Sequence, residues 1–145
     1  MGIVAIPVRL SLAESSAVAL MEAADDLAGA DRAEKFVAAL DTNRLLWLTL
    51  SAVAERHRWA VPAPRTTDFV MTTTRHAGRG LTDQHVETLI AVNREASRGL
   101  VGGRDLDPIR SRAVLAWHES GEQYGLPLGR WLIAEIDRKA RLIAE

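Results

Sequence analysis

The sequence predicts an all-α protein, folded as a single compact bundle of about five to six helices. Three observations lead to this fold class. Helix-capping signals recur along the chain, apolar residues repeat at helical spacing, and the glycine pairs and prolines fall between the periodic segments. The chain of 145 residues fits one domain of common size. We therefore treat residues 1–145 as a single helical domain.

Four of the six expected helix starts carry a capping signal. Two signals are capping boxes, in which a side chain and a glutamate three residues later bond each other's free backbone amides. The other two are N-cap residues, one of them followed by a proline at the first helical position. These signals are Ser11 with Glu14, Asp31 with Glu34, Thr82, and Asp107 with Pro108. The expected helices cover residues 12–28, 32–58, 65–76, 83–101, 109–120 and 128–144.

The third of these segments, residues 65–76, is rich in threonine and could also be read as a strand. A helix is the preferred interpretation, because Phe69, Val70 and Thr73 then lie on one face. We further expect residues 1–10 to be a flexible start and residues 104–145 to form a helical C-terminal extension.

The composition excludes several classes of protein. Hydrophobic residues make up 48% and charged residues 26%, as in globular proteins. The net charge of −1 gives no global basic field that would attract nucleic acid or an anionic membrane. Cysteine is absent, which excludes disulfides and thiolate metal sites. No signal peptide or membrane span is recognisable, so we expect a cytoplasmic protein that does not enter the membrane.

Two expected helices carry an asparagine within an apolar seam. The seams alternate steps of four and three residues, which is the spacing of a packing face. They consist of Phe36, Leu40, Asn43, Trp47, Leu50, Ala54 and His57, and of Thr82, Val86, Leu89, Asn93, Ala96 and Leu100. Each asparagine is followed by an arginine on the flank of the seam, Arg44 and Arg94.

Two interpretations of these Asn-Arg pairs are open. A buried amide without partners costs about 1–3 kcal/mol, so the asparagines can form an internal polar bridge that fixes helix register. Alternatively, they lie in a recognition groove floored by Trp47 and rimmed by Arg44 and Arg94, since aromatic and arginine side chains are typical of binding hot spots. We expect Trp47 to be mainly structural, and at least one asparagine to be buried and bonded to the other helix.

No catalytic motif is present, so we expect a protein that binds another macromolecule and is not an enzyme. The four histidines (His57, His76, His85, His118) have no metal-ligand spacing, and no phosphate-binding glycine loop or nucleophile elbow occurs. We expect no cofactor and no metal. A weak basic cluster leaves nucleic-acid binding as an alternative. It consists of Arg56, Arg58, Arg65, Arg75 and Arg79.

The middle of the chain resembles the FlaF family, regulators of flagellin biosynthesis in alphaproteobacteria. The matching segments are ALDTNRLLW at 39–47, RH at 75–76, VETLIAVNR at 86–94 and GL at 99–100. The resemblance covers about half of the chain, residues 33–101, and the order and spacing of its segments agree with the family apart from a small length difference after His76. The tyrosine- and arginine-bearing start of the family is not evident here, and residues 104–145 extend beyond the resemblance.

The resemblance implies a helical cytoplasmic protein that binds flagellin and supports its production or export, in the manner of a chaperone. It adds the FlbT regulator as a second partner, and it adds Arg75, His76, Leu89 and Ile90 to the residues of the groove interpretation. The expected partner-binding residues are Asn43, Arg44, Trp47, Arg75, His76, Leu89, Ile90, Asn93 and Arg94. Two other hypotheses stay open: a regulator that binds RNA or DNA through its arginines, and an interaction protein that dimerises through exposed tryptophans.

Overall fold

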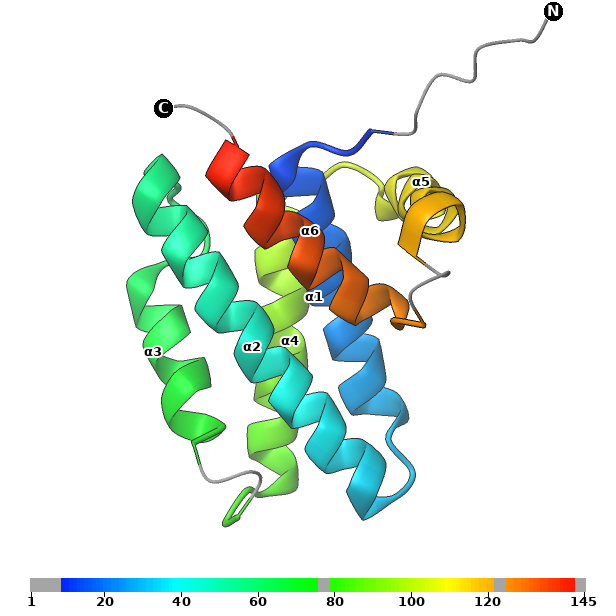
Figure 1. Ribbon diagram of the computed structural model, residues 1–145. Helices are drawn as coiled ribbons and strands as arrows, with labels where there is room; N and C mark the ends of the chain where they lie inside the picture. Colours follow the sequence, from blue (N-terminus) through cyan, green and yellow to red (C-terminus); the bar gives the residue numbers. More distant parts are fainter. Residues whose placement is uncertain (1–8, 76–78, 122–124, 143–145) are drawn as a thin grey trace, which may run out of the picture.

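In the computed structural model, residues 9–75, 79–121 and 125–142 are described, and most of them lie in helices (Figure 1). The expected all-α bundle is confirmed, and the threonine-rich segment is helical. The helices are α1 (Leu12–Gly29), α2 (Ala33–His57), α3 (Pro64–Thr73), α4 (Asp83–Leu100), α5 (Leu106–Ala116) and α6 (Leu128–Leu142). One π-helical turn, η1 (Trp117–Gly121), continues α5.

The two best sequence signals for helix starts are confirmed. Ser11 and Glu14 form the capping box of α1, with bonds of 2.9 and 3.0 Å. The hydroxyl of Thr82 caps α4 by accepting a hydrogen bond from the backbone amide of His85. In return, the ring nitrogen Nδ1 of His85 accepts a hydrogen bond from the backbone amide of Thr82. Both side-chain pairs satisfy backbone amides that have no partner inside the helix.

Two other expected starts are wrong by one or two residues. Helix α2 has Arg32 at its N-cap without a side-chain bond, while Asp31 pairs with Lys35 on the surface at 3.4 Å. Helix α5 is capped by Asp105, which accepts from the amide of Asp107 at 3.1 Å. Pro108 still lies in the first turn, where a missing amide hydrogen costs nothing because it has no intrahelical acceptor.

Helix α1 is the central element, because α2, α4, α5 and α6 all pack against it. Its buried positions are mostly small, and Ser15, Ser16, Ala17 and Ala24 are completely covered. Small side chains let the neighbouring backbones approach closely. The Ser97 hydroxyl of α4, for example, donates to the Ala17 carbonyl at 2.7 Å.

The C-terminal extension belongs to the same core as the rest of the chain. Helix α6 packs against α1 and α2, where Leu132 and Ile136 are fully buried and Trp131 is nearly so. The expected flexible start is wrong for its last residue, since Leu10 is buried and its carbonyl accepts from Lys139 of α6 at 3.0 Å. Residues 1–8 lie outside the described part of the chain.

Candidate functional site: a groove on α2 and α3

The two asparagines singled out by their seams meet inside the bundle. Asn93 of α4 donates from Nδ2 to Oδ1 of Asn43 on α2 at 2.7 Å, and to the Leu20 carbonyl of α1 at 3.3 Å. Its own Oδ1 accepts from the indole Nε1 of Trp47 at 2.9 Å. Asn93 thereby joins α1, α2 and α4 at one point. The interpretation as an internal polar bridge is confirmed.

The alternative interpretation, a groove floored by Trp47, is wrong. Trp47, Asn43, Asn93 and Leu89 are each 0% exposed, so none of these four expected binding residues can touch a partner at the surface of this structure. The physical reason is that a seam with regular steps of four and three residues is a packing face, and the polar groups on it are satisfied internally. The Nδ2 of Asn43 and the Nε2 of His57 are exceptions, because neither has a partner among the described residues.

The described residues leave a groove uncovered on the neighbouring face of α2. It lies between the first half of α2 and the C-terminal end of α3, has a volume of about 690 Å³, and is mainly apolar. Leu40, almost completely buried, and Ala38 contribute to its lining, and Val37 is 44% exposed. Of the expected binding residues, Arg44 and Arg75 line this groove.

Arg44 holds the two walls of the groove together. Its Nη1 donates to the Met71 carbonyl at 2.8 Å and to the Thr74 hydroxyl at 3.3 Å. The last carbonyls of a helix have no intrahelical partner and form the negative end of the helix dipole, so a guanidinium there is favourable. The arginine that follows the buried Asn43 therefore fixes the end of α3 against α2.

The apolar surface continues along α2 beyond the groove. Val37, Leu45 and Leu48 are all exposed, and their spacing of eight and three residues puts them on one face of the helix. Helix α2 runs across the front of the bundle in Figure 1. These residues were missed by the sequence reasoning, which followed only the inward seam. The signal available was a second apolar stripe on the same helix.

The expected rim of Arg44 and Arg94 is not formed. Arg94 and Ile90 lie on α4 and line a different, shallower depression near Ala28, and the guanidinium of Arg94 is 3.6 Å from the Asp25 carboxylate. His76 lies outside the described residues. The set of expected binding residues is thus divided between the core and two separate surfaces.

The arginine cluster is also divided. Arg56 and Arg58 lie at the end of α2 and Arg65 at the start of α3, whereas Arg75 and Arg79 follow the other end of α3. A helix of ten residues separates its ends by about 15 Å. The tryptophans are not exposed either: Trp47 and Trp131 are buried, and Trp59 and Trp117 are partly buried.

Comparisons with known proteins do not identify a relative. No family model matches the sequence, and neither the curated proteins nor the solved structures gave a match. The resemblance to the FlaF family therefore stays a prediction. None of the helices in the described ranges has the length and apolar character needed to cross a membrane.

Proposed function

We propose that this protein binds an amphipathic helix of a protein partner in the groove between α2 and α3, without catalysing a reaction. The observation that carries the proposal is the uncovered apolar groove together with the exposed apolar stripe on α2. A helix laid into a groove through apolar residues at steps of three and four is a recurrent mode of recognition. An exposed apolar strip of this kind has no role in the core of the bundle.

The dimensions of the surface are consistent with a short helix. Val37 and Leu48 are eleven residues apart on α2, which corresponds to about 16 Å, or three helical turns. Charged residues of both signs border the groove: Glu34 and Asp41 on α2, and Arg75 beyond α3. Such an arrangement would set the direction of the partner helix, because opposite charges must face one another.

The resemblance to the FlaF family makes flagellin the first candidate for the partner. The protein would then act in the cytoplasm as a regulator of flagellin production or as an export chaperone, and FlbT would be a second candidate partner. A nucleic-acid-binding regulator is the alternative, and the division of the arginines between the two ends of α3 disfavours it.

Salt dependence tests the proposal. Purified protein and flagellin should form a complex whose dissociation constant changes little between about 50 and 200 mM salt, because apolar burial is not screened. An RNA complex would weaken steeply over the same range. Salt-resistant binding of flagellin supports the proposal, whereas tight binding of RNA at physiological salt without binding of flagellin would overturn it.

A further inference from the structure

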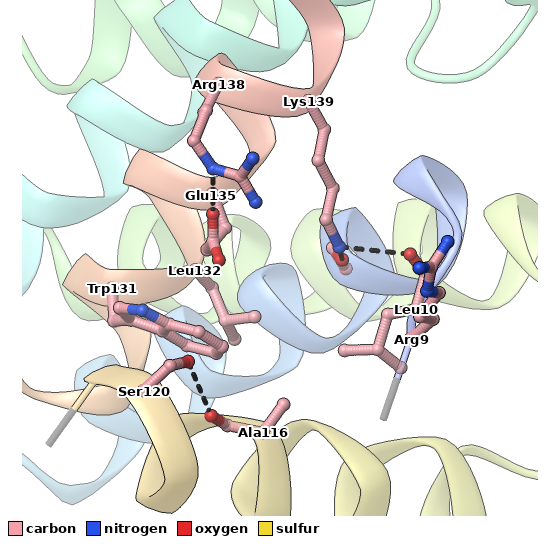
Figure 2. A pocket seen from close by; sticks show the side chains of 10 residues that line it. Arg9, Leu10, Ala116, Ser120, Trp131, Leu132, Glu135, Arg138 and Lys139 are labelled. Atoms are coloured by element: carbon pink, nitrogen blue, oxygen red, sulfur yellow. Dashed lines mark hydrogen bonds and ion pairs between the residues drawn. The ribbon is translucent and has the colours of Figure 1, made fainter. Parts of the chain in front are cut away.

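A second, smaller cavity lies at the opposite edge of the bundle, where α6 meets η1 and the residues that precede α1 (Figure 2). Its volume is about 450 Å³, within the range of small-molecule sites. Trp131, Leu132 and Ala116 provide apolar walls, and Lys139 provides an ammonium group. No residue of the groove between α2 and α3 takes part in it.

Lys139 is the unusual group in this cavity. Its side chain is half-buried, and its Nζ donates to the Leu10 carbonyl at 3.0 Å and lies 3.4 Å from the Ser15 hydroxyl. Both partners are neutral, and no carboxylate of the described residues forms an ion pair with it. Burial lowers the pKa of this ammonium, although the carboxylates of Glu135 and Glu14 oppose the shift.

The nearby carboxylates are already engaged by arginines. Glu135 accepts from Arg138 at 2.7 Å, as Figure 2 shows, and Glu14 accepts from Arg112 at 2.6 Å. A partly desolvated cation without its own counter-ion is favourable only where something compensates its charge. The cavity of about 450 Å³ has room for an anion beside Lys139.

The lining of the cavity also favours a ligand with an apolar part. In Figure 2 the side chain of Lys139 extends down from α6, while the Trp131 ring and Leu132 lie on the other side of the opening. Trp131 is 8% exposed and is therefore fixed by packing, whereas Leu132 is 0% exposed and offers no surface to a ligand. A ligand that reached Lys139 would place its remaining atoms against this rigid apolar surface.

We propose that this cavity binds a small molecule with an anionic head group on an apolar body. The head group, a carboxylate or phosphate, pairs with the ammonium of Lys139, and the body packs against Trp131 and Ala116. The simpler alternative is that Lys139 only ties α6 to the start of α1. The two differ in whether removal of the charge changes the binding of an anion.

Two dyes with the same rings test this pairing. Anilinonaphthalenesulfonate carries an anionic group, whereas phenylnaphthylamine is the same ring system without it, and both fluoresce in apolar sites. The anionic dye should bind the folded protein at one site at least about ten-fold more tightly than the neutral one, since a charged hydrogen bond contributes about 1.5–3 kcal/mol. Lys139→Gln should abolish this preference, and Lys139→Arg should retain it.

Two further variants locate the site. Ala116→Trp should fill the cavity and weaken binding of the anionic dye while leaving Lys139 in place, and it decides the matter if Lys139→Gln does not fold. Val37→Glu, which alters only the groove on α2, should leave the preference unchanged. Displacement of the dye by decanoate or by decyl phosphate distinguishes the two head groups. Equal affinity for the two dyes, an unchanged preference in Lys139→Gln, or no displacement by either competitor would overturn the proposal.

Discussion

The inner and outer faces of α2 differ in an unexpected way. On the inner face an asparagine lies in the middle of an apolar seam, and its oxygen is bonded to Asn93. On the outer face apolar side chains, Val37, Leu45 and Leu48, are exposed to solvent. An ordinary amphipathic helix buries its apolar residues and exposes its polar ones. Both faces of α2 depart from this rule, and the departures have separate explanations.

The comparison shows that one set of residues determines the register of the helices and another set forms the surface available for binding. The inner polar bridge selects one register for α1, α2 and α4, because an amide inside an apolar seam is stable only opposite its partner. The outer apolar strip contributes nothing to this register. The most conspicuous residues of the sequence, Asn43, Trp47 and Asn93, thus serve the fold, and the uncovered surface is formed by less conspicuous residues.

The largest expected effect tests the inner face. Trp47→Ala should lower the free energy of unfolding by about 3–5 kcal/mol, because it removes a large, fully buried side chain and leaves a cavity. Trp47→Phe is the matched control: most of the ring remains, and the cost should be about 1–3 kcal/mol for the unpaired Asn93 oxygen. Urea unfolding measures both. A small effect of Trp47→Ala would contradict a structural role for the inner face.

Substitutions of the two asparagines should lower the free energy of unfolding by different amounts. Asn93→Leu leaves the side-chain Oδ1 of Asn43 and the indole Nε1 of Trp47 without a partner. Asn43→Leu removes one acceptor of the Asn93 Nδ2 group, and it also removes the Nδ2 of Asn43, which has no partner among the described residues. Each should cost about 1–3 kcal/mol, with Asn93→Leu the larger. The double change should cost less than the sum of the single changes. Strict additivity in a thermal unfolding cycle would show that the two amides are not coupled.

Acidic pH should change the stability of the bundle through carboxylates of α1, which lie on neither face of α2. Bonds from Ser11 and Arg112 lower the pKa of Glu14 below its ordinary 4.5, so Glu14 stabilises the fold above that pH and loses this contribution as the pH falls through the folded pKa. The pKa of Asp26 shifts in the opposite direction, since burial and the nearby Glu22 and Asp25 carboxylates raise it.

Melting temperatures measured at several acidic pH values should therefore depend on pH less in Glu14→Gln than in wild type. Asn93→Leu should keep the wild-type pH dependence, because amides do not titrate. The effect of Glu14→Gln at neutral pH should be smaller than that of either asparagine change. An unchanged slope in Glu14→Gln would mean that its contacts with Arg112 and Ser11 do not stabilise the fold.

The sequence was sufficient to predict the helical fold, and it offered the inner bridge as one of two interpretations. Periodic steps of four and three residues placed Asn43 and Asn93 on packing faces, and each amide then needed a partner. The capping signals at Ser11 and Thr82 were equally local. The N-cap of α5 was misplaced by two residues because the side chain of Asp105 accepts from the free amide of Asp107, and the N-cap of α2 was misplaced by one residue because no side chain caps that helix.

The groove could not be predicted from local patterns. It depends on how α3 lies against α2, which is fixed in part by the bond from Arg44 to the Met71 carbonyl, 27 residues away in the chain. No spacing within either helix contains that information. The cavity around Lys139 likewise combines residues from both ends of the chain.

The smallest expected effect on stability belongs to the outer face of α2. Leu48→Glu should change the free energy of unfolding by no more than about 0.5 kcal/mol, because the side chain is 50% exposed. The same change should abolish binding of a partner helix, since a carboxylate would be buried in an apolar interface. Leu115→Glu on α5 is the matched control, since Leu115 is 51% exposed and lies on another helix, outside the proposed interface on α2 and α3. A pull-down with flagellin compares the two variants, and equal binding by both would remove the outer face of α2 from the proposed interface.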